Sequence, residues 1–83
     1  MSRPNVNEDI DIDWPSVGRR IRELRGFDTN QARFAEAIGI TQSYVSAIER
    51  GQKEIGVVPL FKIARIYGKS IEWLLTGNDA ECK

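Results

Sequence analysis

Apolar residues recur at helical spacing through most of the chain, and they predict a domain built only of helices. Trp14, Val17, Ile21 and Leu24 are three or four residues apart, which is the stripe of an amphipathic helix. This spacing predicts a helix over residues 15–25.

Two shorter helices are expected next. Phe34 and Ile38 share one face of a helix over residues 31–38, with Asn30 as a favourable N-cap. Gly39 ends this helix, since glycine readily adopts the left-handed conformation found at such ends.

The next helix is predicted only three residues later, over residues 42–49. Thr41 can cap its start, Val45 and Ile48 supply its inward face, and Gly51 stops the pattern.

Two more helices complete the pattern. The first follows a loop over residues 50–57, contains Pro59 in its first turn and ends before Gly68. Ser70 then caps a short helix over residues 71–75. The chain is therefore expected to be an all-α domain of five helices.

The segment from Gln31 to Arg50 fits a helix-turn-helix, in which two helices cross steeply through a tight turn. Such a motif needs a small residue where the helices cross and a flexible residue in the turn, and Ala35 and Gly39 stand at these places. Five apolar residues occupy its core positions: Phe34, Ile38, Ile40, Val45 and Ile48.

Composition argues against an enzyme. The 83 residues fit one domain, contain no histidine, and include a single cysteine, Cys82. A Gly-rich phosphate loop is also absent. We therefore expect no catalytic site, metal, cofactor or small-molecule ligand. Without a leader or a long apolar stretch, the chain is expected to be cytoplasmic and to have no contact with a membrane.

Charge is neutral overall, with 12 basic and 12 acidic residues, but it is unevenly placed. Residues 17–77 hold ten basic and six acidic side chains, an excess of four positive charges. The remaining acids lie mainly before them. The sequence thus predicts a flexible acidic arm over residues 1–12, a folded domain over 13–77 and a tail over 78–83.

From Val17 to Gly77 the chain resembles the lambda-repressor, Cro and Xre family of five-helix DNA-binding domains. The resemblance lies in the segments GRRIREL, NQARFAEAIGITQSYVSAIERG, LFKIARIYG and SIEWLLTG, in the family's order and spacing. It covers about three quarters of the chain. One departure is the connector from Gly26 to Asn30, which is a residue shorter than usual.

The resemblance implies that residues 42–49 form the recognition helix in the major groove of double-stranded DNA. Gln42 corresponds to a family glutamine that reads adenine, and an amide can pair with both N6 and N7 of that base. Ser43 can donate or accept a hydrogen bond, and Ala47 offers a methyl-sized contact to thymine. The residues expected to face the bases are Gln42, Ser43, Ser46 and Ala47.

Other polar residues around this helix are candidates for phosphate contacts. The resemblance implies that Gln31 contacts a phosphate and braces Gln42. The remaining candidates for phosphate contact or positioning are Asn30, Arg33, Tyr44, Arg50 and Lys53. A solvated surface role is the alternative for each.

The resemblance also implies a structural ion pair between Arg25 and Glu49, which ties the first helix to the recognition helix. The aromatic residues Trp14, Phe34, Tyr67 and Trp73 lie on apolar stripes and are expected to pack in the core.

An apolar surface left on the last helix is expected to serve association. The candidates for a homodimer interface are Trp73, Leu74 and Leu75. A two-fold dimer would fit a palindromic operator, because it places two recognition helices about 34 Å apart.

The function favoured by these patterns is a sequence-specific transcriptional regulator, and a repressor rather than an activator. A second hypothesis is a protein-interaction module, such as an antitoxin-like regulator that uses the same fold to bind a partner protein. The two hypotheses differ in whether Gln42 contributes to DNA binding.

Overall fold

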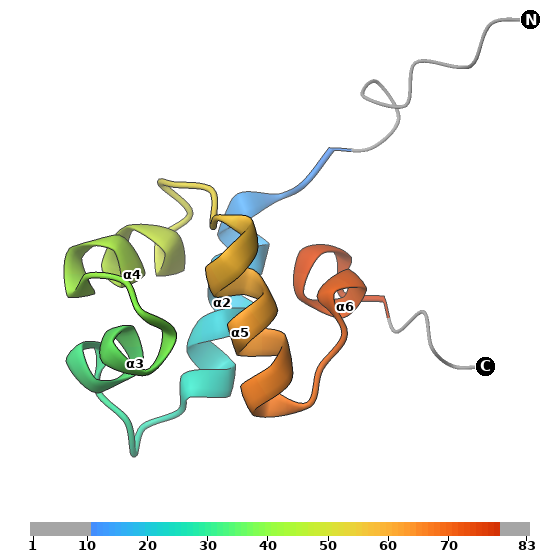
Figure 1. Cartoon of the computed structure of the whole chain (residues 1–83). Coiled ribbons are helices and arrows are strands. Elements are labelled where there is room, and N and C mark those ends of the chain that lie inside the picture. Colours follow the sequence, from blue (N-terminus) through green and yellow to red (C-terminus); the bar gives the residue numbers. More distant parts are fainter. Residues whose placement is uncertain (1–10, 79–83) are drawn as a thin grey trace, which may run out of the picture.

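The computed structural model describes residues 11–78, which contain helices and no strand (Figure 1). The helices are α2 (Trp14–Arg25), α3 (Gln31–Ile38), α4 (Gln42–Glu49), α5 (Val57–Tyr67) and α6 (Ile71–Thr76). The all-α prediction with five helices is confirmed. Residues 1–10 of the predicted arm and residues 79–83 of the predicted tail, including Cys82, lie outside the described residues.

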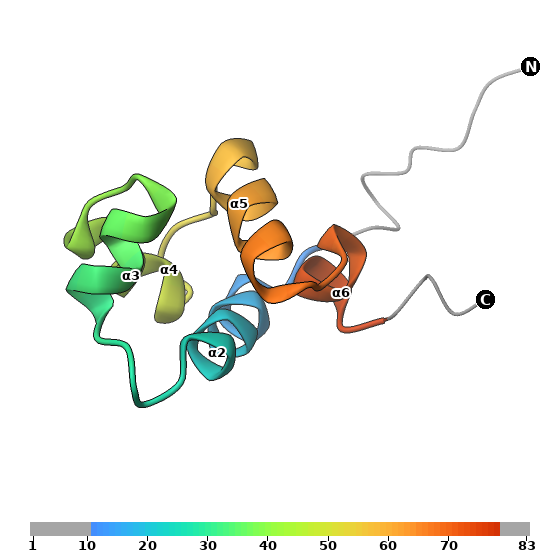
Figure 2. The same cartoon turned by 60° about the horizontal axis from the view of Figure 1, so that its bottom comes forward.

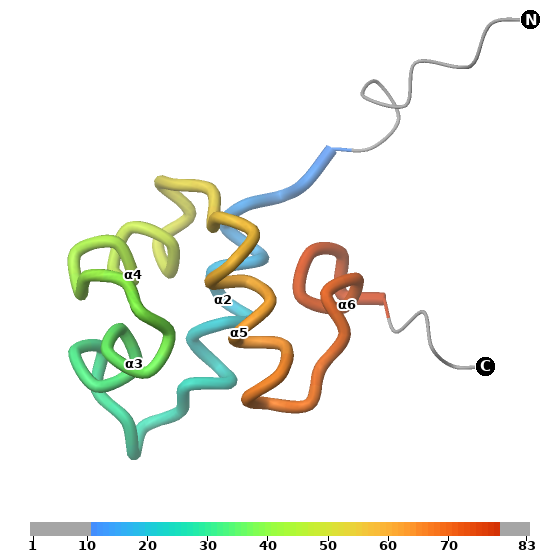
Figure 3. The backbone as a smooth tube through the Cα atoms, viewed as in Figure 1, coloured from blue at the N-terminus to red at the C-terminus, as the bar shows by residue number. Residues whose placement is uncertain are grey.

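Local capping explains where three of the helices begin. The side chains of Asn30, Thr41 and Ser70 each accept a hydrogen bond from the backbone N–H three residues further on, at 2.9, 3.1 and 2.9 Å. Gly39 has a left-handed backbone, with φ of 77°, and ends α3. The tight turn that follows is visible in the backbone trace (Figure 3). The capping residues and the turn glycine are as predicted.

One apolar core holds the helices together. In Figures 1 and 2, α3 and α4 lie at one end of the molecule, α6 lies at the other, and α2 and α5 lie between them. α2 packs against α4 and α6, and α3 packs against α4 and α5. The fully or nearly buried side chains are Val17, Ile21, Phe34, Ala35, Ile38, Val45, Ile48, Ile55, Leu60, Ile63, Ala64 and Leu74.

The aromatic residues behave as predicted for core packing. Phe34 is buried and lies 6.2 Å from Tyr67 between ring centroids. Trp14, Tyr67 and Trp73 are partly buried against the core. Ile12, which the sequence places in the arm, also packs against the core. The packed domain therefore includes a residue before Asp13.

Gly18 is the point where α2 passes closest to the end of α4. A Cβ atom at this position would lie 2.2 Å from the backbone oxygen of Ile48 and 2.7 Å from that of Glu49. Both distances are far below van der Waals contact, and backbone atoms cannot rotate away. The absence of a side chain at Gly18 thus lets α2 pack directly against the end of α4.

We expect Gly18→Ala to lower the free energy of unfolding by about 1–3 kcal/mol, because the added methyl group must push α2 away from α4. Urea unfolding measures this loss. Gly56→Ala is the matched control, because its methyl group would lie 3.6 Å from Pro59 Cδ, an ordinary contact distance. The control is expected to lose less than about 1 kcal/mol. Equal losses in the two variants would contradict the steric explanation.

Candidate nucleic-acid interface

The side of α4 that faces away from the core carries only small or polar side chains. Successive residues of a helix are rotated by about 100° around its axis. Because Val45 and Ile48 face the core, the residues on the opposite side of α4 face outward. Gln42 and Ser43 are exposed there, and Ser46 and Ala47 are partly buried. The structure therefore brings the four predicted base-contacting residues to one surface. We call it the α4 outer face (Gln42, Ser43, Ser46 and Ala47).

The side of α4 next to α2 is held by an ion pair. Arg25 donates through Nε and Nη2 to the two carboxylate oxygens of Glu49, at 2.7 and 3.0 Å. The side chains are only 13% and 4% exposed, so the pair is shielded from water. These hydrogen bonds raise the pKa of Arg25 above its ordinary value, although burial opposes the rise. The predicted Arg25–Glu49 pair is confirmed.

Gln31, the first residue of α3, differs from its prediction. Its side-chain amide Nε2 donates to Glu49 Oε1 at 2.9 Å, so its partner is Glu49 rather than Gln42. The physical reason is charge, because a shielded carboxylate is a stronger acceptor than a neutral amide. Arg25 also donates to the backbone oxygen of Thr29 at 2.8 Å. These bonds fix the start of α3 against the end of α4.

Tyr44 was predicted to contact phosphate, and the structure gives its hydroxyl group another role. The hydroxyl donates to the backbone oxygen of Glu54 at 3.0 Å and accepts from the backbone N–H of Gly56 at 3.0 Å. A phenol has only one proton to donate, so this hydroxyl has none left for a phosphate. Tyr44 instead ties α4 to the start of α5.

The remaining phosphate candidates lie around the α4 outer face. Arg50 is exposed directly after α4, where its guanidinium donates to Ser46 Oγ. Lys53 lines a shallow hollow of about 400 Å³ on the side of α4 that carries Tyr44. Asn30 caps α3, which occupies its side-chain oxygen. Arg33 is exposed one turn further along α3. The structure thus places candidates on both sides of the outer face.

The apolar surface is not where the sequence places the dimer candidates. Leu74 is fully buried and belongs to the core, while Trp73 and Leu75 are partly buried against it. Among the exposed large apolar side chains, Val57, Val58 and Phe61 lie together on the first turns of α5, whereas Phe27, Ile66 and Ile71 lie apart from them. Helical periodicity alone does not show which side of such a short helix is covered.

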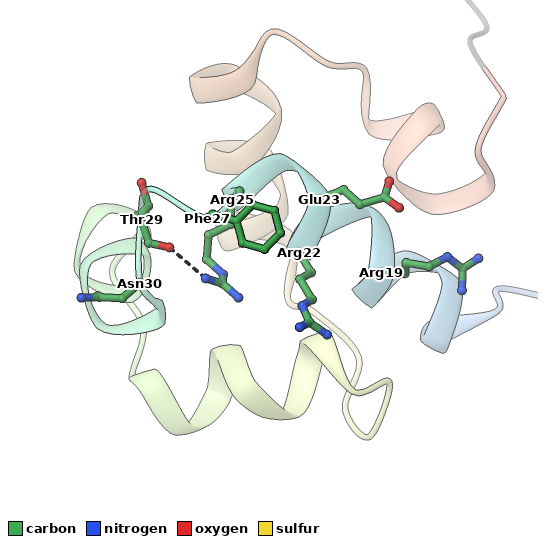
Figure 4. A pocket seen from close by; sticks show the side chains of 8 residues that line it. Arg19, Arg22, Glu23, Arg25, Phe27, Thr29 and Asn30 are labelled. Carbon is green, nitrogen blue, oxygen red and sulfur yellow. Dashed lines mark hydrogen bonds between the residues drawn. The ribbon is translucent and has the colours of Figure 1, made fainter.

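A larger hollow of about 690 Å³ beside α2 escaped the sequence analysis (Figure 4). It is lined by the last two turns of α2 and by the connector to α3. Arg19, Arg22 and Arg25 contribute its basic side chains. In the sequence, these arginines stand out only through their contribution to the net charge. A signal for Arg22 was nevertheless present, because its spacing of four residues from Gly18 places it one turn further along the same side of α2.

Residues 11–78 contain neither a cluster of metal ligands nor a helix that could span a membrane. No three histidine, cysteine, aspartate or glutamate side chains gather there as a metal ion requires. None of the helices in this range has the length and apolar character needed to cross a membrane.

The fold and the capped, outward-facing α4 define a helix-turn-helix domain, and comparison with known proteins agrees. The helix-turn-helix family model matches residues 19–74. The chain therefore belongs to this family, and its class is that of DNA-binding transcriptional regulators. A comparison with curated protein sequences finds no match.

Solved structures that are similar to this chain include a repressor and a controller protein. The P22 c2 repressor protein, solved in complex with a synthetic operator, has a TM-score of 0.68 and 27% identity, over 75% of this chain and 96% of that one. The restriction-modification controller protein C.AhdI from Aeromonas hydrophila has a TM-score of 0.66 and 33% identity, over 76% and 97%. The predicted family and fold class are confirmed.

Proposed function

We propose that this chain binds an operator in double-stranded DNA with α4 in the major groove, and that it acts as a repressor in the cytoplasm. The observation that carries the proposal is the α4 outer face. This face starts with the exposed amide of Gln42, and its other side chains are small. The bonds of Glu49 to Arg25 and Gln31 hold the end of α4 against α2 and α3. A major groove about 12 Å wide admits such a helix. The P22 c2 repressor, solved on a synthetic operator, supports the assignment.

Selection of bound sequences from a random pool of duplex DNA tests this function. A recurring half-site is expected among the selected sequences, and specific affinity should exceed non-specific affinity by at least about a thousandfold. Failure to enrich any sequence would contradict operator binding. It would favour the second hypothesis, in which the domain binds a partner protein.

We further infer that the protein binds as a homodimer through the first turns of α5. Val57, Val58 and Phe61 lie on adjoining positions of this helix and are 49–78% exposed. We call them the α5 apolar face. Their burial against a second copy would remove apolar area from water.

The position of this face also suits a palindromic operator. Tyr44 bonds to the backbone at Glu54 and Gly56, directly before α5. A two-fold axis at the α5 apolar face would therefore lie beside both recognition helices. This arrangement favours their entry into successive major grooves on one side of the DNA, about 34 Å apart.

Val58→Glu is expected to convert the dimer to a monomer, because a carboxylate at the centre of an apolar interface would lose its water without gaining a partner. Sedimentation velocity measures the mass of each species. Ile66→Glu is the control, since Ile66 is exposed about two turns further along α5 than Val58 and its variant should remain dimeric. A wild-type protein that stays monomeric both free and on operator DNA would contradict the homodimer.

A further inference from the structure

Arg22 lies on the side of α2 that crosses the recognition helix. Gly18 touches the last turn of α4, and Arg22 follows it by four residues, or about one helical turn. Arg25, three residues further on, reaches Glu49 at the end of α4. Figure 4 shows the guanidinium of Arg22 directed toward α4, whereas that of Arg19 points away along α2.

The three arginines of the hollow differ in how they are bonded. Arg25 is occupied by Glu49 and by the backbone oxygen of Thr29. Arg19 donates to Ser16 Oγ at 3.3 Å. Within residues 11–78, the side chain of Arg22 makes no hydrogen bond or ion pair and is exposed. Arg22 is therefore a positive charge beside α4 that the fold itself does not use.

The electrostatic surroundings of Arg22 favour an anion. Glu49, the carboxylate nearest to the end of α4, is neutralised by its pair with Arg25. Glu23 also lines the hollow, but Figure 4 shows its carboxylate on the side away from α4. The hollow ends at Asn30, where α3 begins and its first N–H groups carry partial positive charge.

The position of Arg22 beside α4 indicates which anion it would meet if α4 lies in the major groove of DNA. A helix in the major groove has a phosphate strand on each side. Lys53 lies on one side of the α4 outer face, and the start of α3 together with Arg22 lies on the other. Given the proposed operator binding, on which this inference rests, we propose that Arg22 contacts a DNA phosphate. It is then a positioning residue that holds the strand bordering α3 without contacting a base.

The salt dependence of operator binding tests this contact, because each neutralised phosphate contributes about 0.9 to the slope of log affinity against log salt concentration. Arg22→Gln should make the slope shallower by about 0.9 per bound protomer, or about 1.8 for a dimer on its operator. Affinity should fall similarly for all DNA sequences. Arg22→Lys should keep most of the slope, since the charge remains.

Arg19→Gln is the matched control, because it removes the same charge from the same helix at a side chain directed away from α4. Its slope should change by less than about half as much as that of Arg22→Gln. An Arg22→Gln protein with the wild-type slope of log affinity against log salt concentration would overturn the contact. A variant whose only change is a lower urea midpoint would also overturn it. If the wild-type protein binds no duplex at any salt concentration, the proposed function fails together with this contact.

Discussion

Glu49→Ala is expected to lower the free energy of unfolding by about 3 kcal/mol, the lower end of the loss when one partner of a buried ion pair is removed, because Arg25 and Glu49 keep some exposure to water. The carboxylate of Glu49 accepts hydrogen bonds from Arg25 Nε and Nη2 and from Gln31 Nε2. Alanine would leave the largely buried guanidinium without its counter-charge. In a domain of this size, each kcal/mol corresponds to about 4–8 °C in Tm. Thermal unfolding should therefore shift by more than about 10 °C.

Two variants distinguish the loss of the ion pair from the general effect of removing an acidic side chain. Glu36→Ala removes an exposed carboxylate from α3 and should change stability by no more than about 0.5 kcal/mol. Glu49→Gln keeps an acceptor for the arginine but not the charge, so an intermediate loss is expected. A Glu49→Ala protein as stable as Glu36→Ala would contradict the structural role. The folded fraction should still select the wild-type half-site, because Glu49 lies outside the α4 outer face.

Features set by neighbouring residues could be predicted from the sequence. Asn30, Thr41 and Ser70 cap helices because each side chain bonds to a backbone group three residues away. The left-handed turn at Gly39 is equally local. The α4 outer face followed from helical periodicity once Val45 and Ile48 were recognised as inward. The family resemblance supplied the Arg25–Glu49 pair, which local rules do not imply.

Features that depend on packing between helices could not be predicted in the same way. Tyr44 was expected to meet phosphate, but the chain after α4 turns back and brings two backbone groups to its hydroxyl. Gln31 bonds to Glu49 because α3 begins beside the end of α4. Leu74 is buried because α6 packs on both α2 and α5. In each case the partner depends on the positions of elements distant in the sequence.

The contribution of Gln42 to base recognition gives the second large expected effect. Gln42 is exposed at the first position of α4, and Thr41 caps the backbone beneath it. A bidentate pair between an amide and adenine is worth about 1–3 kcal/mol of discrimination. Because the proposed homodimer would carry two copies of Gln42, Gln42→Ala should weaken binding to the best operator by about 2–6 kcal/mol, at least about 30-fold. Gel-shift titration measures this loss.

The pattern of losses across DNA sequences distinguishes base recognition from a phosphate contact. Gln42→Ala should relax the preference at one base pair of each half-site and leave non-specific binding nearly unchanged, because a base contact is absent from non-specific complexes. Gln52→Ala is the matched control, since Gln52 is exposed in the loop after α4 and bonds to Arg50 at 3.4 Å. Any loss in the control should be small and the same for all sequences. A Gln42→Ala protein that binds the best operator as tightly as wild type would show that the amide does not contact a base. Specificity would then have to come from Ser43, Ser46 and Ala47, or from the shape of the DNA.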